Sequence, residues 1–307
     1  MTRTAQIPGA VARPTTRRGV GDTSFALLLT LPGLALMAAV VLYPLVGALV
    51  TAFFKQSLVV PGRTFVGLDN LRAVLADDFW PILRQTVIFS VGATVAPFII
   101  GSGLALALNT GIRGRTFLRG ILLFPWLVPS VVVSFLWMWI FNANYGVANG
   151  VLEGLGIIDT PQAWLARPAT AMAAVIIAKT WASFPWMMVM LLAGLQTVPP
   201  ELHEAAEVDG AGAVRRFTSI TLPHLKGIIG LVLLLELIWN FQQFDTIYVL
   251  TGGGPAGSTK TFAVAVYETA FQGFDLGRAG ALGLLWMALL LPMMVVYVRL
   301  SERGEGS

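Results

Sequence analysis

Several residue types on which soluble enzymes depend are scarce in this sequence. Its 307 residues include no cysteine, which excludes disulfides, thiol nucleophiles and cysteine-ligated metals. The two histidines, His203 and His224, are too few and too far apart for a histidine-based site. Charged residues make up only 12% of the chain, fewer than a soluble domain of this length needs to cover its surface. The sequence therefore predicts no catalytic residues and no metal site.

Apolar residues are in excess instead. Hydrophobic types make up 56% of the chain, and the mean hydropathy is +0.77. This excess needs a second apolar solvent, and we expect that solvent to be lipid. The net charge of +4 does not indicate nucleic-acid binding, because the basic residues are scattered in short loops between apolar runs. A bias of positive charge toward one side of a membrane is the simpler explanation.

Long apolar runs recur along the chain. A helix needs about 20 mostly apolar residues to cross a bilayer, and six stretches meet this requirement. We predict spans at residues 25–54, 86–108, 121–141, 171–195, 228–250 and 281–300. The first run is too long for the core of a secretory signal, so we expect it to be retained. The predicted fold is an all-α membrane protein with about six transmembrane helices.

The distribution of Lys and Arg predicts the orientation. With the N-terminus inside, the cytoplasmic pieces carry more basic residues than the outer loops, and six spans then leave both termini in the cytoplasm. We expect a multi-pass protein of the bacterial cytoplasmic (inner) membrane. Its predicted parts are a cytoplasmic tail (1–24), a transmembrane domain (25–301) containing a cytoplasmic loop at about 196–226, and a short tail (302–307).

The loop between the fourth and fifth spans has an unusual pattern. Pro199 and Pro200 suit a helix start, and acidic residues follow in the first turns, where the helix dipole favours them. Gly210 and Gly212 would end that helix, and a second short helix from Ala213 would lead back to the membrane. The pattern predicts a compact helix-turn-helix projecting into the cytoplasm, although a plain polar connector is the simpler alternative.

The same loop resembles the EAA signature of binding-protein-dependent ABC importer permeases. That signature reads Glu-Ala-Ala, three residues, Gly, nine residues, Ile, any residue, Leu-Pro. Every position matches in place, at Glu204, Ala205, Ala206, Gly210, Ile220, Leu222 and Pro223. The loop also lies between two spans, on the predicted cytoplasmic side. The resemblance implies the transmembrane domain of a type I ABC importer, with these residues coupling it to an ATPase.

The resemblance also implies partners. The chain would be a transport subunit rather than an enzyme, with no cofactor of its own, because ATP and Mg would be bound by a separate ATPase subunit. It would assemble with a second homologous permease, two copies of the ATP-binding subunit, and an extracytoplasmic solute-binding protein. Membrane lipid would surround it, and no nucleic acid would bind.

A second resemblance narrows the family. Residues 244–255, which read Phe-Asp-Thr-Ile-Tyr-Val-Leu-Thr-Gly-Gly-Gly-Pro, look like the first of the two permeases in carbohydrate importers of the maltose and glycerol-phosphate type. Residues 124–129 and 137–141 fit the same group, and the resemblance spans about residues 25–300. It implies import of a sugar, either a di- or oligosaccharide or a related polyol.

Polar side chains within the predicted spans are costly in lipid and are therefore functional candidates. Two sets each form one stripe at helical spacing: Lys179, Ser183 and Trp186 in the fourth span, and Glu236, Asn240 and Gln243 in the fifth. By resemblance, these faces would line the substrate pathway. The alternative is that they only hold the helices together.

The charges of Lys179 and Glu236 depart from the family pattern, in which neutral groups are common at these points. The two residues could pair with each other or recognise a charged substrate. The identity of the solute and the share of its contacts made by the partner permease are left open.

Two other classes of membrane protein were weighed. An ion-gradient-driven secondary transporter would usually have more spans, internal repeats and ion-binding groups, and it leaves the EAA match unexplained. A polytopic membrane enzyme would need a cluster of His, Asp or Glu at one membrane face, and the sequence shows none.

Overall fold

The computed structural model describes residues 20–110 and 113–305, and the chain divides into two compact units, residues 1–48 and 49–307. Residues 1–19 of the predicted N-terminal tail lie outside the described residues. The first unit contains helix α1 (Val20–Met37) and a π-helical turn, η1 (Ala38–Leu42), and its boundary with the second unit falls within α2 (Tyr43–Thr51). The predicted first span is therefore helical over its described length up to Thr51.

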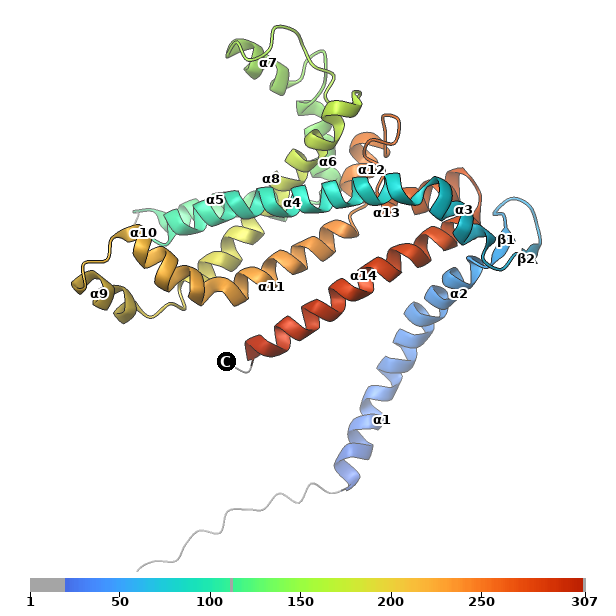
Figure 1. The fold of residues 1–307 in the computed structure, drawn as a ribbon, viewed down its shortest axis with the longest axis horizontal. Coiled ribbons are helices and arrows are strands. Elements are labelled where there is room, and N and C mark those ends of the chain that lie inside the picture. The colour runs from blue at the N-terminus through green and yellow to red at the C-terminus, as the bar shows by residue number, and fades with distance from the viewer. Residues whose placement is uncertain (1–19, 111–112, 306–307) are drawn as a thin grey trace, which may run out of the picture. The chain divides into compact units, whose positions relative to one another are not determined.

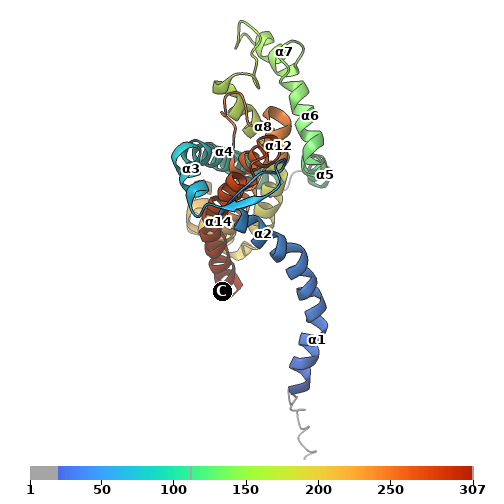
Figure 2. The ribbon, with the colours of Figure 1, turned by 90° about the vertical axis from the view of Figure 1, so that its right-hand side faces the viewer.

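The second unit is built mainly of helices, with one small antiparallel hairpin at one end (Figures 1 and 2). Its elements are β1 (Phe54–Gln56), β2 (Arg63–Phe65), α3 (Asp69–Asp77), α4 (Phe79–Leu108), α5 (Arg115–Leu127), α6 (Ser130–Ile140), α7 (Val147–Gly154), α8 (Pro168–Leu195), α9 (Pro200–Val208), α10 (Ala213–Arg216), η2 (Phe217–Thr221), α11 (Leu222–Phe241), α12 (Asp245–Thr251), α13 (Phe262–Tyr267), η3 (Glu268–Gln272) and α14 (Leu276–Glu305). Helix α14 therefore runs on into the predicted C-terminal tail.

The predicted number of spans is confirmed. Among the described residues, five helices are long and apolar enough to cross a membrane, and the bent pair α5–α6 makes a sixth span if it is counted as one. Figure 1 shows α9 at the opposite end of the second unit from β1, β2 and α3.

The third predicted span is not one straight helix. Helices α5 and α6 meet at an angle of 93°, whereas the sequence predicted a continuous span over residues 121–141. The break lies at Val128 and Pro129, which both have extended backbone angles. Proline has no N–H to donate, and it disfavours helical angles in the residue before it. This local effect ends α5, although the run is apolar throughout.

The fifth predicted span is displaced toward the N-terminus. Its helix runs without interruption from Ala213 to Phe241, whereas the prediction was residues 228–250 with a separate short helix before it. The chain then leaves helical geometry at Gln242 and resumes as α12. The expected second short helix is therefore the first part of this span.

Two π-helical turns, η1 and η2, accommodate prolines inside long helices. Tyr43 N–H donates to the Ala38 carbonyl and Leu222 N–H donates to the Phe217 carbonyl, each five residues back. In both cases proline is the next residue, Pro44 or Pro223. A proline inside a helix removes an N–H and crowds the carbonyl four residues back, and a widened turn relieves that clash.

The closest helix packing joins α4 and α8. A Cβ built on Gly101 of α4 would lie 2.7 Å from the Met187 Cβ and 2.8 Å from the Met188 backbone nitrogen of α8. Backbone at this distance leaves no room for a side chain, as is common where membrane helices pack through small residues. Buried leucines from α4, α8 and α11 surround the same end of the bundle, namely Leu108, Leu191, Leu192, Leu195 and Leu225.

Polar contacts tie the opposite end together. Arg278, at the start of α14, donates from Nε and Nη2 to Asp78 at 2.9 and 2.6 Å. Buried Thr86 accepts the backbone N–H of Phe262 at 3.1 Å, which fixes α13 against α4. These contacts hold α3, α4, α13 and α14 as one body at this end.

The contact at Gly101 predicts the effect of one added methyl group. We expect Gly101→Ala to lower the stability of the assembled complex by about 1–3 kcal/mol, because the α8 backbone cannot move aside cheaply. Gly103→Ala, two residues further along the same helix, meets no atom within 4 Å and serves as the control. Thermal unfolding of the purified complex in lipid nanodiscs measures both, and equal midpoints for the two variants would contradict the packing described here.

Candidate functional site

The helix predicted in the loop between the fourth and fifth spans is present as α9. It begins at Pro200, whose missing N–H costs nothing in the first helical turn, and Glu201 lies in that turn. It ends in a Schellman motif: Ala211 N–H donates to the Ala206 carbonyl at 2.8 Å, and Gly210 N–H donates to the Glu207 carbonyl at 3.0 Å. Gly210 has a φ of +75°, which glycine adopts without strain. The predicted helix end at Gly210 is confirmed.

A tight connection links α9 to the fifth span. Gly212 is extended and begins α10, and the Arg216 guanidinium forms an ion pair with the Glu207 carboxylate at 2.8 Å. Because α10, η2 and α11 form one helix, the turn after α9 leads directly into the span that carries Glu236.

Most of the EAA residues lie on the surface. Glu204, Ala205 and Gly210 are exposed, and Ala206 is half-buried. Ile220 is half-buried in η2, while Leu222 and Pro223 are exposed at the start of α11. Two further apolar side chains, Val208 and Val214, flank the glycine turn and are 88% and 78% exposed. The sequence analysis did not single out these two valines, although they lie inside the matched loop.

A cavity of about 230 Å³ lies between the spans. Five helices contribute to it, namely α5, α6, the middle of α8, the last turns of α11 and the start of α12, together with the break between α5 and α6. The lining residues are Pro125, Trp126, Val128, Ser130, Val133, Lys179, Ala182, Ser183, Trp186, Glu236, Trp239 and Thr246. Four of the six predicted substrate-pathway residues are therefore brought together here, namely Lys179, Ser183, Trp186 and Glu236.

Three tryptophans form a continuous aromatic wall of this cavity. The Trp186 ring of α8 stacks on Trp126 of α5, with ring centroids 5.8 Å apart, and it contacts Trp239 of α11 at 5.4 Å. Among the described residues, the buried Trp186 Nε1 has no hydrogen-bond acceptor. The sequence analysis identified Trp186 alone. Trp239 lies three residues after Glu236, a spacing that could have indicated it, whereas Trp126 joins the wall only because of the α5–α6 break.

The charged groups of the cavity come from three helices. Lys179 on α8 interacts electrostatically with Glu236 on α11 and with Asp245 at the start of α12. Among the described residues, no Lys179–Glu236 nitrogen–oxygen distance is 4.0 Å or less, so the two form no direct ion pair. Glu236 is only 2% exposed, Asn240 Nδ2 donates to its Oε1 at 3.4 Å, and Ser183 lines the same cavity.

The other two predicted pathway residues lie outside the cavity lining. Asn240 is buried against α4, where its Nδ2 donates to the Ala93 carbonyl at 2.9 Å and to Thr94 Oγ1 at 3.1 Å. It therefore serves the helix contact that the sequence analysis held open as an alternative. Gln243 lies beyond the end of α11, off the predicted stripe, and its Nε2 donates to Thr246 Oγ1 at 3.3 Å.

Three polar residues in or near the cavity lining, Ser130, Asp245 and Thr246, were not predicted as site residues. Ser130, at the start of α6, lines the cavity and donates to the Asp245 carboxylate at 2.9 Å. The contact joins residues 115 positions apart in sequence and depends on the bend before α6. A spacing pattern within one helix could not have indicated it.

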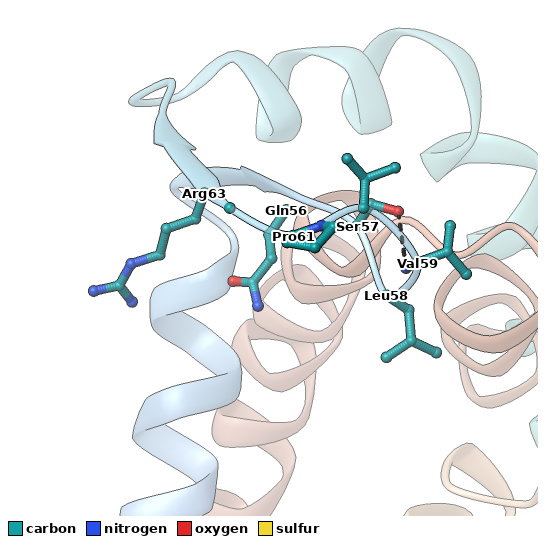
Figure 3. A pocket seen from close by; sticks show the side chains of 8 residues that line it. Gln56, Ser57, Leu58, Val59, Pro61 and Arg63 are labelled. Atoms are coloured by element: carbon teal, nitrogen blue, oxygen red, sulfur yellow. Dashed lines mark hydrogen bonds between the residues drawn. The ribbon is translucent and has the colours of Figure 1, made fainter.

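A larger hollow, of about 400 Å³, lies at the β1–β2 loop (Figure 3). Its lining comes from one continuous segment, residues 56–63, so no second element closes it. In Figure 3 the side chains of Arg63, Leu58 and Val59 point away from one another. This hollow is the inner side of a surface loop, and the tryptophan-lined cavity is the better candidate for a solute site.

Comparisons with known proteins agree with this architecture. Residues 98–303 match the family model described as binding-protein-dependent transport system inner membrane component. The trehalose/maltose transport system permease protein MalF of Thermococcus litoralis is 37% identical over 282 residues, covering 92% of this chain and 95% of that protein. The sulfoquinovosyl glycerol transport system permease protein SmoG of Agrobacterium fabrum is 37% identical over 289 residues, covering 93% of each.

A solved structure shows the same fold. A chain in the crystal structure of a bacterial ABC transporter involved in the import of the acidic polysaccharide alginate superimposes with a TM-score of 0.79, at 22% identity, over 92% of this chain and 97% of that one. The family match covers more than half of the chain, and the curated relatives match it over almost their whole length. The chain therefore belongs to the binding-protein-dependent transport system inner membrane components, the multi-pass permease subunits of ABC transporters.

Proposed function

We propose that this chain is the permease subunit of an ATP-driven, binding-protein-dependent importer for a sugar, either a di- or oligosaccharide or a related polyol. It forms half of the translocation pathway beside a second, homologous permease. Two copies of an ATPase subunit bind ATP and Mg and contact the EAA loops. An extracytoplasmic solute-binding protein delivers the substrate. Both termini of the chain lie in the cytoplasm.

The tryptophan wall is the observation that carries the sugar assignment. Sugar rings have apolar faces that pack on aromatic rings and hydroxyl edges that need hydrogen-bond partners. The cavity combines the stacked rings of Trp126, Trp186 and Trp239 with the polar groups of Ser130, Ser183 and Thr246. Such a mainly apolar pocket with a few placed polar groups is typical of small-molecule sites. The names of two relatives, which mention trehalose, maltose and sulfoquinovosyl glycerol, support the same class of substrate.

The substrate pathway on this chain comprises Lys179, Ser183, Trp186 and Glu236, together with Trp126 and Trp239. Trp186 is the central stacking surface, and its unpaired Nε1–H is a donor for a sugar hydroxyl. Asn240 acts indirectly by bonding α11 to α4, and Gln243 orients the start of α12 through Thr246.

The exposed surface of α9 is the proposed contact for the ATPase. Glu204, Ala205, Ala206 and Gly210 make that contact, and Ile220, Leu222 and Pro223 shape the connection to α11. The small side chains allow close approach of a partner surface. ATP binding closes the ATPases and draws the two EAA loops together, and the uninterrupted helix from Ala213 to Phe241 carries this motion to Glu236 and Trp239.

The first experiment is an ATPase assay. The complex is co-purified with its ATPase, reconstituted in lipid with its binding protein, and supplied with a panel of neutral sugars and glycerol phosphates. We expect one class of sugar to stimulate hydrolysis. If no ATPase co-purifies and uptake follows an ion gradient instead, the importer assignment fails in favour of a secondary transporter.

Substitution of the glycine in the α9 turn tests the coupling proposal. At φ +75°, Gly210→Asp strains the turn by about 1–2 kcal/mol and places a charge on the contact surface. We expect the protein to remain inserted, while sugar-stimulated ATPase activity and uptake fall by about tenfold or more. The matched control is Gly212→Asp, because Gly212 has a φ of −65° at a helix-capping position that favours aspartate. Normal stimulated activity in Gly210→Asp would overturn the coupling role.

A tryptophan substitution tests the proposed sugar contact. In Trp186→Ala one stacking surface is lost, which is worth about 0.5–1.5 kcal/mol beyond the buried area of the ring. The sugar concentration that gives half-maximal ATPase stimulation should therefore rise about tenfold. Trp139→Ala removes the same residue type from an exposed position on α6 outside the cavity lining, and should change it little. Equal effects of the two variants would remove Trp186 from the sugar site.

A further inference from the structure

The charges around the cavity indicate which sugars it accepts. Lys179 and Glu236 are the ionisable residues in the lining, and Asp245 lies directly behind Ser130, which donates to its carboxylate at 2.9 Å. Lys179 interacts with both carboxylates. One cation is thus opposed by two anions from separate helices, so the formal charge of this group is negative rather than positive.

The two carboxylates differ in their surroundings. Glu236 is almost fully buried, between Ser183 of α8 and Asn240 of α11, so its charge is poorly screened by water. Asp245 is exposed at the start of α12. A substrate carboxylate or sulfonate that approached Lys179 would therefore meet one buried and one accessible negative charge. Because electrostatic repulsion is strong at short range in a weakly polar site, these carboxylates would oppose its binding.

From this arrangement we propose that the cavity selects uncharged glycosides. Glu236 and Asp245 offset the positive charge of Lys179 and thereby exclude acidic sugars. The proposal rests on the function proposed above and narrows its substrate class. Glu236 is then a specificity-determining residue: it prevents Lys179 from recognising an anion. One relative is named for sulfoquinovosyl glycerol, which is a sulfonated sugar, so members of this family can differ in the charge of their substrate.

Matched substrate pairs separate charge from shape. Glucosyl glycerol and sulfoquinovosyl glycerol share one skeleton and differ by a sulfonate in place of a hydroxyl, and maltitol and maltobionate share an open-chain end and differ by a carboxylate in place of a hydroxymethyl group. Binding is measured with the full complex in nanodiscs, without the binding protein, by quenching of tryptophan fluorescence. The omission matters because the binding protein applies its own selection before the permease is reached.

We expect the wild-type complex to prefer the neutral member of a pair by about tenfold or more. In Glu236→Gln, which keeps the shape of the side chain and one acceptor oxygen for the Asn240 amide, the affinity ratio should shift by about tenfold toward the anionic member. Lys179→Met added to that variant should reverse the shift, because no cation then attracts the anion. Asp245→Asn should move the ratio in the same direction as Glu236→Gln, and its exposed position makes it a second test if the buried variant fails to assemble.

The outcomes are distinct. Preference of the wild type for the anionic sugars, or an unchanged ratio in both carboxylate variants, would overturn the charge-selection proposal while leaving the importer assignment intact. Absence of binding and of ATPase stimulation by every sugar of the panel would overturn the proposed function itself.

Discussion

The hydrocarbon core of a bilayer offers no water to bond with backbone N–H and C=O groups, and every span of this chain is shaped by that condition. Long helices satisfy the condition internally. Breaks are tolerated where other parts of the protein surround the exposed groups, and the breaks at Pro129 and at Gln242–Phe244 both lie beside the tryptophan-lined cavity. The interruptions of the helices and the proposed solute site are therefore one feature of the fold.

The same helices connect the cavity with the end of the bundle that carries α9. The helix from Ala213 to Phe241 joins the turn after α9 to Glu236 and Trp239, with a π-turn admitting Pro223 near its start. Helix α8 carries Lys179 and Trp186, and it packs closely against Gly101 of α4 at Met187 and Met188. In the proposed cycle, the motion of the EAA loop passes along α11. Relative displacement of α11 and α8 would change the spacing of Trp186 and Trp239, and thus the shape of the site.

The cavity combines aromatic rings with charged side chains in a small volume. Its aromatic wall suits the face of a sugar ring, and its charges are held by residues of three different helices. Asn240 shows how such a site is supported, because it lies one turn from Glu236 and bonds α11 to α4. A polar residue in a span can therefore serve the substrate site without touching the substrate.

Composition and local pattern alone determined the membrane class, the number of spans, the helix of the EAA loop and its end at Gly210. These properties depend on solvent and on short-range backbone chemistry, which residue types report directly. Local chemistry also contained the bend at Pro129, although the apolar run concealed it. Only the tertiary structure decided that Trp126 and Ser130 join Lys179, that Asn240 faces α4, and that Gln243 leaves the predicted stripe. These outcomes depend on which helix faces are opposed in space, and helical periodicity gives the face of each helix but not its neighbour.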